Sequence, residues 1–357
     1  MQYLENIKEF VKNKIVYCGI DIHEEHWSLC FICAGEMIEK IRIEGDSMKL
    51  FSHLKKVYGL ASQVHCVYEA GYSGFALLRK LTSEGYKCSI TPPNRVPQSK
   101  DKVKTDKRDA TTLAKFLSVG LLKRVSVPPM SIEADRQIIR LRVSCQQKLT
   151  RVKCQIKSHL KLFDIKWPKE YGNKWTKRYL NWLSTLEFEE PNLRIVLDFY
   201  LQEYYFLRDR LADITRKIRK LSLSGSYHKH YKLLVVCKGI GLITAMTFLI
   251  ELSDLSRFVS AEAFSSYLGM TPSQFSSGAN VRLGHITREG NSHVRRVLVE
   301  ASWTVRRYDA TLNDKYNRIR AKGTNGKKAI VAVARSLALR MRRCILDEKP
   351  YVMGKIQ

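Results

Sequence analysis

The sequence predicts an α/β domain with a mixed sheet, followed by helical domains. Before about residue 95, short β-rich runs alternate with helical periodicity, and from about Ile132 the apolar residues follow helical periods. The 357 residues, 45% of them hydrophobic, are enough for two or three domains that each bury a core. The predicted fold class is therefore α/β plus all-α.

Five strands are expected in the first domain. The first three follow one another as a meander, with Gly35-Glu36 joining the second to the third. A helix capped by Asp46-Ser47, a strand, a second helix and a last strand ended by Pro92-Pro93 complete the pattern. A meander followed by helix–strand units favours a sheet with both parallel and antiparallel pairs. The expected strands are 15–20, 27–34, 37–43, 64–68 and 87–91.

Two long apolar seams are expected in the middle of the chain. From Leu193 to Leu221, apolar positions alternate in steps of four and three over four heptads, which is typical of a coiled coil. A less regular seam runs from Ile138 to Phe163 on a basic helix. The two seams can pack on each other within one chain or pair between chains, and the pattern leaves both open.

A further helical domain is expected after the polar linker 222–226. Two helices flank Gly239-Ile240-Gly241, which predicts a helix-hairpin-helix, and a loop is expected over 270–291. Two arginine-rich helices, 292–308 and 327–344, follow. The predicted domains are 1–125, 126–226 for the coiled-coil and linker helices, 227–347, and a tail over 348–357.

The positive charge of the chain is unevenly distributed. Lys and Arg number 62 against 34 Asp and Glu, which leaves a formal charge of +28. Residues 1–94 carry 11 basic and 11 acidic side chains, whereas 95–160 carry 16 and 5, and 281–343 carry 16 and 4. A merely solubilising surface would be more even, so the two basic blocks predict contact with the phosphates of nucleic acid.

The sequence predicts an intracellular protein without a membrane partner. No apolar stretch approaches the length of about 20 residues that a membrane span needs. The first residues show no secretory signal, and the nine cysteines are expected to be reduced thiols. We expect a cytoplasmic protein.

Four carboxylates form the candidate metal site. Asp21 and Glu69 end the first and fourth predicted strands, and Asp106 and Asp109 share one face at the start of a helix. Taken singly, each is explained as a turn residue or a helix cap. Together they would repel one another unless they held divalent metal, and hard oxygen ligands favour Mg²⁺ or Mn²⁺.

The motifs that carry these acids resemble a known family. Gly19-Ile20-Asp21, Tyr68-Glu69-Ala70-Gly71 and residues 104–110 (KTDKRDA) are similar to the RuvC-like domain of an insertion-sequence transposase family. The likeness continues in residues 237–241 (CKGIG), 267–272 (YLGMTP) and 284–291 (GHITREGN). The family includes the Piv-type DNA invertases and the bridge-RNA-guided recombinases. The resemblance covers about residues 15–125 and 230–345 of this chain.

The resemblance implies a RuvC-like (RNase H-like) first domain and a C-terminal serine domain. Asp21, Glu69, Asp106 and Asp109 match the metal-binding acids, and Ser277 matches a serine that attacks the DNA phosphate and forms a phosphoserine link. The neighbouring Ser276 competes with Ser277 on sequence alone. The implied partners are donor and target DNA, a structured guide RNA, and further copies of the chain in a dimer or tetramer.

Basic residues and glycines near these motifs are the candidate nucleic-acid contacts. One group surrounds the acids of the third motif, a second forms the Gly-x-Gly turn that can present backbone N–H groups to a phosphate, and a third follows the serine. They are Lys104, Lys107, Arg108, Lys238, Gly239, Gly241, Arg282, Arg288, Arg295 and Arg296.

The predicted activity is that of a transposase or site-specific recombinase that uses a serine nucleophile and metal. Two alternatives remain open. In one, a resolvase-like endonuclease cuts DNA with water and Ser277 is structural. In the other, the chain only binds nucleic acid and its carboxylate site is inactive.

Overall fold

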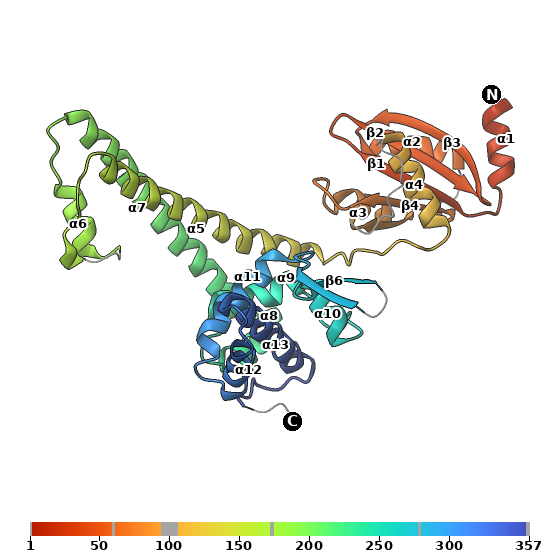
Figure 1. The fold of residues 1–357 in the computed structure, drawn as a ribbon. Helices are drawn as coiled ribbons and strands as arrows, with labels where there is room; N and C mark the ends of the chain where they lie inside the picture. The colour runs from red at the N-terminus through yellow and green to blue at the C-terminus, as the bar shows by residue number, and fades with distance from the viewer. Residues whose placement is uncertain (1, 59–60, 94–105, 172–174, 278–279, 355–357) are drawn as a thin grey trace. The chain divides into compact units, whose positions relative to one another are not determined.

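The computed structural model describes residues 2–58, 61–93, 106–171, 175–277 and 280–354. The chain divides into two compact units, Met1–Val127 and Pro128–Gln357 (Figure 1). The finer division into domains made above stays a prediction. No helix in the described ranges is long and apolar enough to cross a membrane.

The N-terminal unit contains a five-stranded mixed sheet in the order β3-β2-β1-β4-β5. β1 pairs antiparallel with β2, β2 antiparallel with β3, and β1, β4 and β5 run parallel. The predicted mixed sheet is confirmed, whereas the first helix, which buries Ile7 and Val11, was not predicted. The elements are α1 (Gln2–Val11), β1 (Val16–Ile22), β2 (His26–Cys33), β3 (Glu36–Glu44), α2 (Ser47–Tyr58), β4 (Val64–Glu69), α3 (Ala76–Ser83), β5 (Lys87–Thr91) and α4 (Asp106–Ser118).

The two faces of this sheet are covered differently. One face packs against α2 and α3 in the main core, which includes Ile20 of β1, Leu54 of α2 and Leu81 of α3. The opposite face is covered by α4, and the contact is closest at Gly19. A Cβ at Gly19 would lie 2.1 Å from the carbonyl oxygen of Ala110, so only glycine lets the helix approach this strand.

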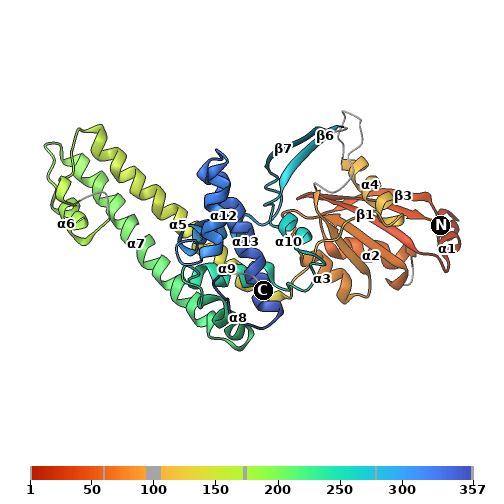
Figure 2. The ribbon, with the colours of Figure 1, turned by 60° about the horizontal axis from the view of Figure 1, so that its bottom comes forward.

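In the second unit, two long helices pack side by side. α5 (Met130–Leu162) and α7 (Pro191–Ser222) run antiparallel within the chain, because Arg142 bonds to Thr215 and His159 contacts the carbonyl of Leu193. Figures 1 and 2 both show the pair, with α6 (Lys177–Thr185) at its far end. The sequence pattern allowed the two seams to pair within one chain or between chains, and in the structure they pair within one chain. The seam of α5 differs from the prediction, because Leu141, which was expected in the buried seam between Ile138 and Phe163, is 44% exposed.

The remaining helices form the C-terminal part of the same unit. Their core includes Phe248, Leu298 and Leu337. The stretch 270–291 was predicted as a loop, and that prediction is wrong, since it contains two antiparallel strands. The elements are α8 (Gly225–Val235), α9 (Leu242–Leu252), α10 (Ala261–Tyr267), β6 (Pro272–Ser277), β7 (Asn280–Ile286), α11 (Ser292–Val305), α12 (Ala310–Ala321) and α13 (Gly326–Leu346).

Candidate active site

A row of polar side chains crosses the sheet at the carboxyl ends of its parallel strands. Asp21 of β1 is paired with Ser28 of β2, and Glu69 of β4 is paired with Thr91 of β5. Asp21 and Glu69 directly follow the last paired residues of β1 and β4, so they are neighbours on parallel strands. Because residues i and i+2 of a strand share a face, Asp21 lies on the side of Gly19, which α4 covers.

The direction of α4 brings its first turn toward this row. Ala110 lies against Gly19, whereas Leu117, near the other end of the helix, lines a hollow with His65 at the start of β4. The helix therefore runs opposite to β1, and Asp109 lies on the Asp21 side of the contact with Gly19. Asp106 is the first residue of α4, and its side chain lies outside the described part of the structure.

The carboxylate of Asp21 is partly exposed and has a polar neighbour. Its side chain is 20% exposed, and Oδ2 lies 3.1 Å from Nε2 of His23. Desolvation, followed by the negative charges of Glu24 and Asp21, raises the pKa of the Tyr72 hydroxyl. Tyr72, which is 71% exposed, thus lies within electrostatic range of the end of β1.

The donor chemistry of the row fits a hard divalent cation, because Asp and Glu supply oxygen ligands. Within the described side chains, however, no three His, Cys, Asp or Glu groups are close enough together to enclose a metal ion. The hydroxyl of Thr91, beside Glu69, is buried and has no hydrogen-bond partner in that part of the chain. The described acids therefore do not enclose a metal ion by themselves, and a buried polar atom without a described partner lies next to Glu69.

The candidate serine belongs to the second unit. Ser277 ends β6 and is paired with Asn280 of β7, while Ser276 is paired with Val281. The side chains of both serines and of Arg282 lie outside the described part of the structure. Both Ser276 and Ser277 therefore stay candidates for the nucleophile.

The base of the β6–β7 hairpin is anchored to the helices by close backbone contacts. Gly290 has a φ of +132°, and a Cβ there would lie 2.0 Å from the carbonyl oxygen of Tyr267. Arg295 donates from Nη1 to the carbonyl of Leu268 at 3.0 Å, so part of this candidate DNA contact is used within the fold. Arg288 and Arg296 are exposed.

A buried ion pair joins α9 to α5 next to this anchor. Glu251 has no exposed side-chain surface and accepts from Arg140 at 2.9 and 3.0 Å, and from Asn291 at 2.7 Å. Burial alone would raise the pKa of Glu251, but the hydrogen bonds from Arg140 and Asn291 outweigh it and lower the pKa. Asn291 also caps α11, because its Oδ1 accepts from the backbone of Val294. Both the oxygen and the nitrogen of its side-chain amide are therefore bonded.

The Gly-x-Gly turn connects α8 and α9. Gly239 has a φ of +108°, and a Cβ there would lie 2.8 Å from the backbone nitrogen of Val305. Gly241 precedes α9, and a Cβ there would meet nothing within 4 Å. Lys238 is exposed, with Nζ 5.5 Å from the centre of the Tyr308 ring.

The remaining candidate contacts surround the third motif, and half of the polar row was not predicted. Lys104 lies outside the described residues, and the side chains of Lys107 and Arg108 are likewise not described. Ser28 and Thr91 were missed because only strand pairing reveals that they flank the two acids. A polar residue on an otherwise apolar strand was the available signal.

The chain matches two family models. Residues 18–164 match the DEDD transposase model of the IS110 group, and residues 231–317 match the model described as Transposase IS116/IS110/IS902 family. The DEDD transposase domain implies dependence on a divalent metal ion, and the four acids named above lie within its range.

Full-length relatives agree with these matches. The y4qE protein of Sinorhizobium fredii, which is named as a transposase, is 30% identical over 85% of this chain and 81% of its own length. The transposase for insertion sequence element IS1533 of Leptospira borgpetersenii is 27% identical over 94% of this chain and 97% of its own. The pilin gene-inverting protein of Moraxella bovis is 24% identical over the same shares. The chain therefore belongs to the IS110/IS116 family of transposases, enzymes of DNA recombination.

Proposed function

We propose that the chain cuts and rejoins DNA by metal-dependent phosphoryl transfer at the carboxylate row of its N-terminal unit. The observation that carries this proposal is the placement of Asp21 and Glu69 on neighbouring parallel strands, on the face covered by α4. The N-terminal turn of α4, with Asp109, points to the same edge of the sheet. Such a sheet with this set of acids is what a RuvC-like domain requires.

Each acid has a role in this reaction. Asp21 and Glu69, with Asp106 and Asp109 from α4, would hold one or two Mg²⁺ or Mn²⁺ ions. Bound metal would neutralise the charge that develops on the phosphate during transfer. Asp21 is also within hydrogen-bond distance of His23, which keeps its carboxylate oriented while it binds.

The second part of the proposal concerns the nucleophile. The hydroxyl oxygen of Ser277 bonds to the phosphorus, and the bond from phosphorus to the 3′ or 5′ oxygen of the cut strand breaks. The leaving oxygen takes up a proton and the serine loses its own. The phosphoserine bond keeps the energy of the broken bond for rejoining. Gly290 and Asn291 hold the base of the hairpin to the helices, and Ser277 lies at its other end, where β6 turns into β7. Guidance by a structured RNA and assembly into a dimer or tetramer complete the proposal.

The experiment that tests this function looks for a covalent adduct. Full-length protein is incubated with Mg²⁺ and DNA from the ends of the element that encodes it, and the denatured products are separated by size. We expect a protein–DNA adduct in the wild type, none in Ser277→Ala, and an undiminished adduct in Ser273→Ala. Ser273 is a matched control on the same strand, where its hydroxyl donates to the carbonyl of His285 at 3.0 Å.

The outcomes separate the candidate mechanisms. Cleavage that survives in Ser277→Ala without any adduct would mean that water attacks, as in a metal-dependent nuclease. An adduct that moves to Ser276 would correct the residue and keep the mechanism. The RNA part is tested by sequencing nucleic acid that copurifies with the full-length chain, and random cellular RNA alone would contradict it.

A further inference from the structure

The edge strand β3 carries two unpaired cations on the side of the sheet that α4 covers. Lys40 and Arg42 are both exposed, and neither has an ion pair within the described part of the chain. They share a face because they are two residues apart, at about 7 Å along the strand. The opposite face of β3 belongs to the core, where Ile41 packs.

Strand pairing relates these cations to the carboxylate row. Arg42 is paired with Ser28 of β2, and Ser28 is paired with Asp21 of β1. Arg42 is thus in the same row as Asp21, two strand spacings or about 10 Å away. Lys40 is paired with Cys30, two residues farther from this edge of the sheet.

A third cation comes from α4. Burial raises the pKa of the Cys30 thiol, and the positive charges of Lys40 and Lys115 act against this rise. The geometry agrees, because Cys30 is paired with Lys40 of β3 and is buried in one cluster with Ala114, the residue before Lys115 on α4. Lys115 is exposed. The three cations line the margin between α4 and β3.

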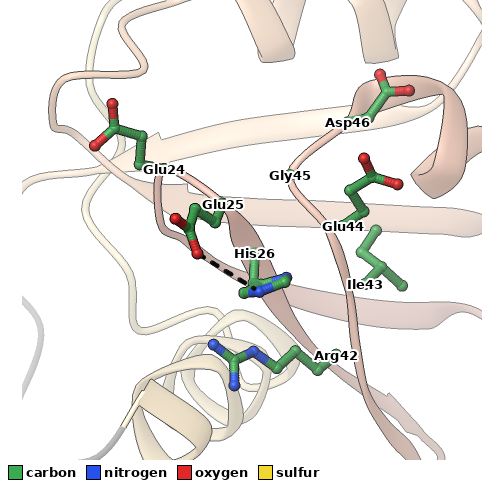
Figure 3. A pocket seen from close by; sticks show the side chains of 8 residues that line it. All are labelled: Glu24, Glu25, His26, Arg42, Ile43, Glu44, Gly45 and Asp46. Atoms are coloured by element: carbon green, nitrogen blue, oxygen red, sulfur yellow. Dashed lines mark ion pairs between the residues drawn. The ribbon is translucent and has the colours of Figure 1, made fainter.

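A simpler role for Arg42 would be to neutralise the acids beside it. Arg42 lines a hollow of about 800 Å³ together with Glu24, Glu25, Glu44 and Asp46, a volume typical of ligand pockets. The ion pair found there joins Glu25 to His26 at 3.9 Å, and Arg42 pairs with none of the four carboxylates. Figure 3 shows its guanidinium pointing away from Glu44 and Asp46. An arginine that neighbouring carboxylates leave free is suited to bind phosphate through two parallel hydrogen bonds.

We propose that Lys40, Arg42 and Lys115 form a phosphate-binding track that guides the DNA strand to be cut toward Asp21 and Glu69. The track rests on the proposed function, because it assumes that nucleic acid reaches the carboxylate row. It selects no sequence, since contacts to phosphates position a strand without reading its bases. We assign the track to DNA and not to a guide RNA because it ends at the reacting acids.

The test measures how DNA binding depends on salt. Each phosphate contact contributes about 0.9 to the slope of log K against log salt on duplex DNA. Binding of the full-length chain to a labelled DNA duplex, and to an RNA duplex of the same sequence, is measured without divalent metal. We expect the double variant Lys40→Gln/Arg42→Gln to reduce the DNA slope by about 1.8. Arg42→Lys should keep the wild-type slope, and so should Lys49→Gln, an exposed lysine on α2 across the sheet.

A direct contact assay guards against variants that unfold. A photo-crosslinking amino acid replaces Lys40 in one protein and Lys49 in another, and crosslinked DNA is expected from position 40 only. An unchanged DNA slope with no crosslink from position 40, or a loss confined to RNA, would overturn the proposal. Since no cleavage is involved, this failure is distinct from failure of the proposed function, which Asp21→Asn decides by activity.

Discussion

Replacement of Gly19 tests whether the contact between β1 and α4 positions the acids. The Cβ of alanine at this position would lie 2.1 Å from the carbonyl oxygen of Ala110 and 2.6 Å from the backbone nitrogen of Ala114. Both are backbone atoms, so no side-chain rotation can relieve the clash. α4 must retreat by about 1 Å, and overpacking of this kind costs about 1–3 kcal/mol.

The functional effect should exceed the effect on stability. A displacement of about 1 Å at a reacting centre can reduce a rate on the order of 100-fold. We therefore expect Gly19→Ala to lose most metal-dependent DNA cleavage at a temperature where circular dichroism still reports a folded chain. The measurement is the single-turnover cleavage rate beside a thermal unfolding curve.

Gly225→Ala is the matched control, because a Cβ there would meet nothing within 4 Å. It should leave both rate and unfolding unchanged. Full activity and unchanged unfolding in Gly19→Ala would refute the inference that α4 presses on β1 beside the acids.

Three further changes have distinct expected results. Glu251→Ala should lower the free energy of unfolding by about 2–3 kcal/mol at neutral pH, because Arg140, the more buried Arg136 and the amide of Asn291 lose the buried carboxylate. Since the folded pKa of Glu251 is lowered, its stabilisation is present above the pKa of the unfolded carboxyl and is lost as pH falls through the folded pKa. Chemical unfolding of wild type and variant should thus converge in acid, and a constant difference would contradict the ion-pair explanation. Gly239→Ala, at a φ of +108°, should cost roughly 1–3 kcal/mol in the same assay, whereas Gly241→Ala should cost little. Asp109→Asn should abolish cleavage and keep DNA binding in a gel-shift assay, and retained cleavage would remove Asp109 from the metal site.

The sheet was predictable because its strands carry strong local signals. Runs such as 27–34 and 64–68 are rich in apolar and β-branched residues, and Asp46 caps α2 as expected by accepting from the backbone of Met48. The β6–β7 hairpin was missed because residues 272–286 include three Ser, two Gly and one Pro and show no regular alternation of apolar and polar residues. Its strands are defined by pairing with each other, which a local pattern does not report.

The candidate site was predictable only in part. Asp21 and Glu69 could be located at strand ends, but their flanking residues Ser28 and Thr91 follow from strand register. The same holds for Arg42. In the sequence it resembles any exposed residue of an edge strand, and only the strand register shows that it lies in the row of Asp21. Chemistry that depends on one residue type at a strand end is visible in sequence, whereas chemistry assembled across strands is not.

Metal-dependent cleavage by acid variants tests most directly whether the carboxylate row is the catalytic centre. Single-turnover cleavage of DNA is measured with Mg²⁺ for wild type, Asp21→Asn and Glu25→Gln, whose carboxylate is 87% exposed and lies outside the row. We predict cleavage by wild type and Glu25→Gln that stops when the metal is chelated, and none by Asp21→Asn at unchanged DNA binding. Wild-type cleavage rates in Asp21→Asn would contradict the assignment of the catalytic centre to this row.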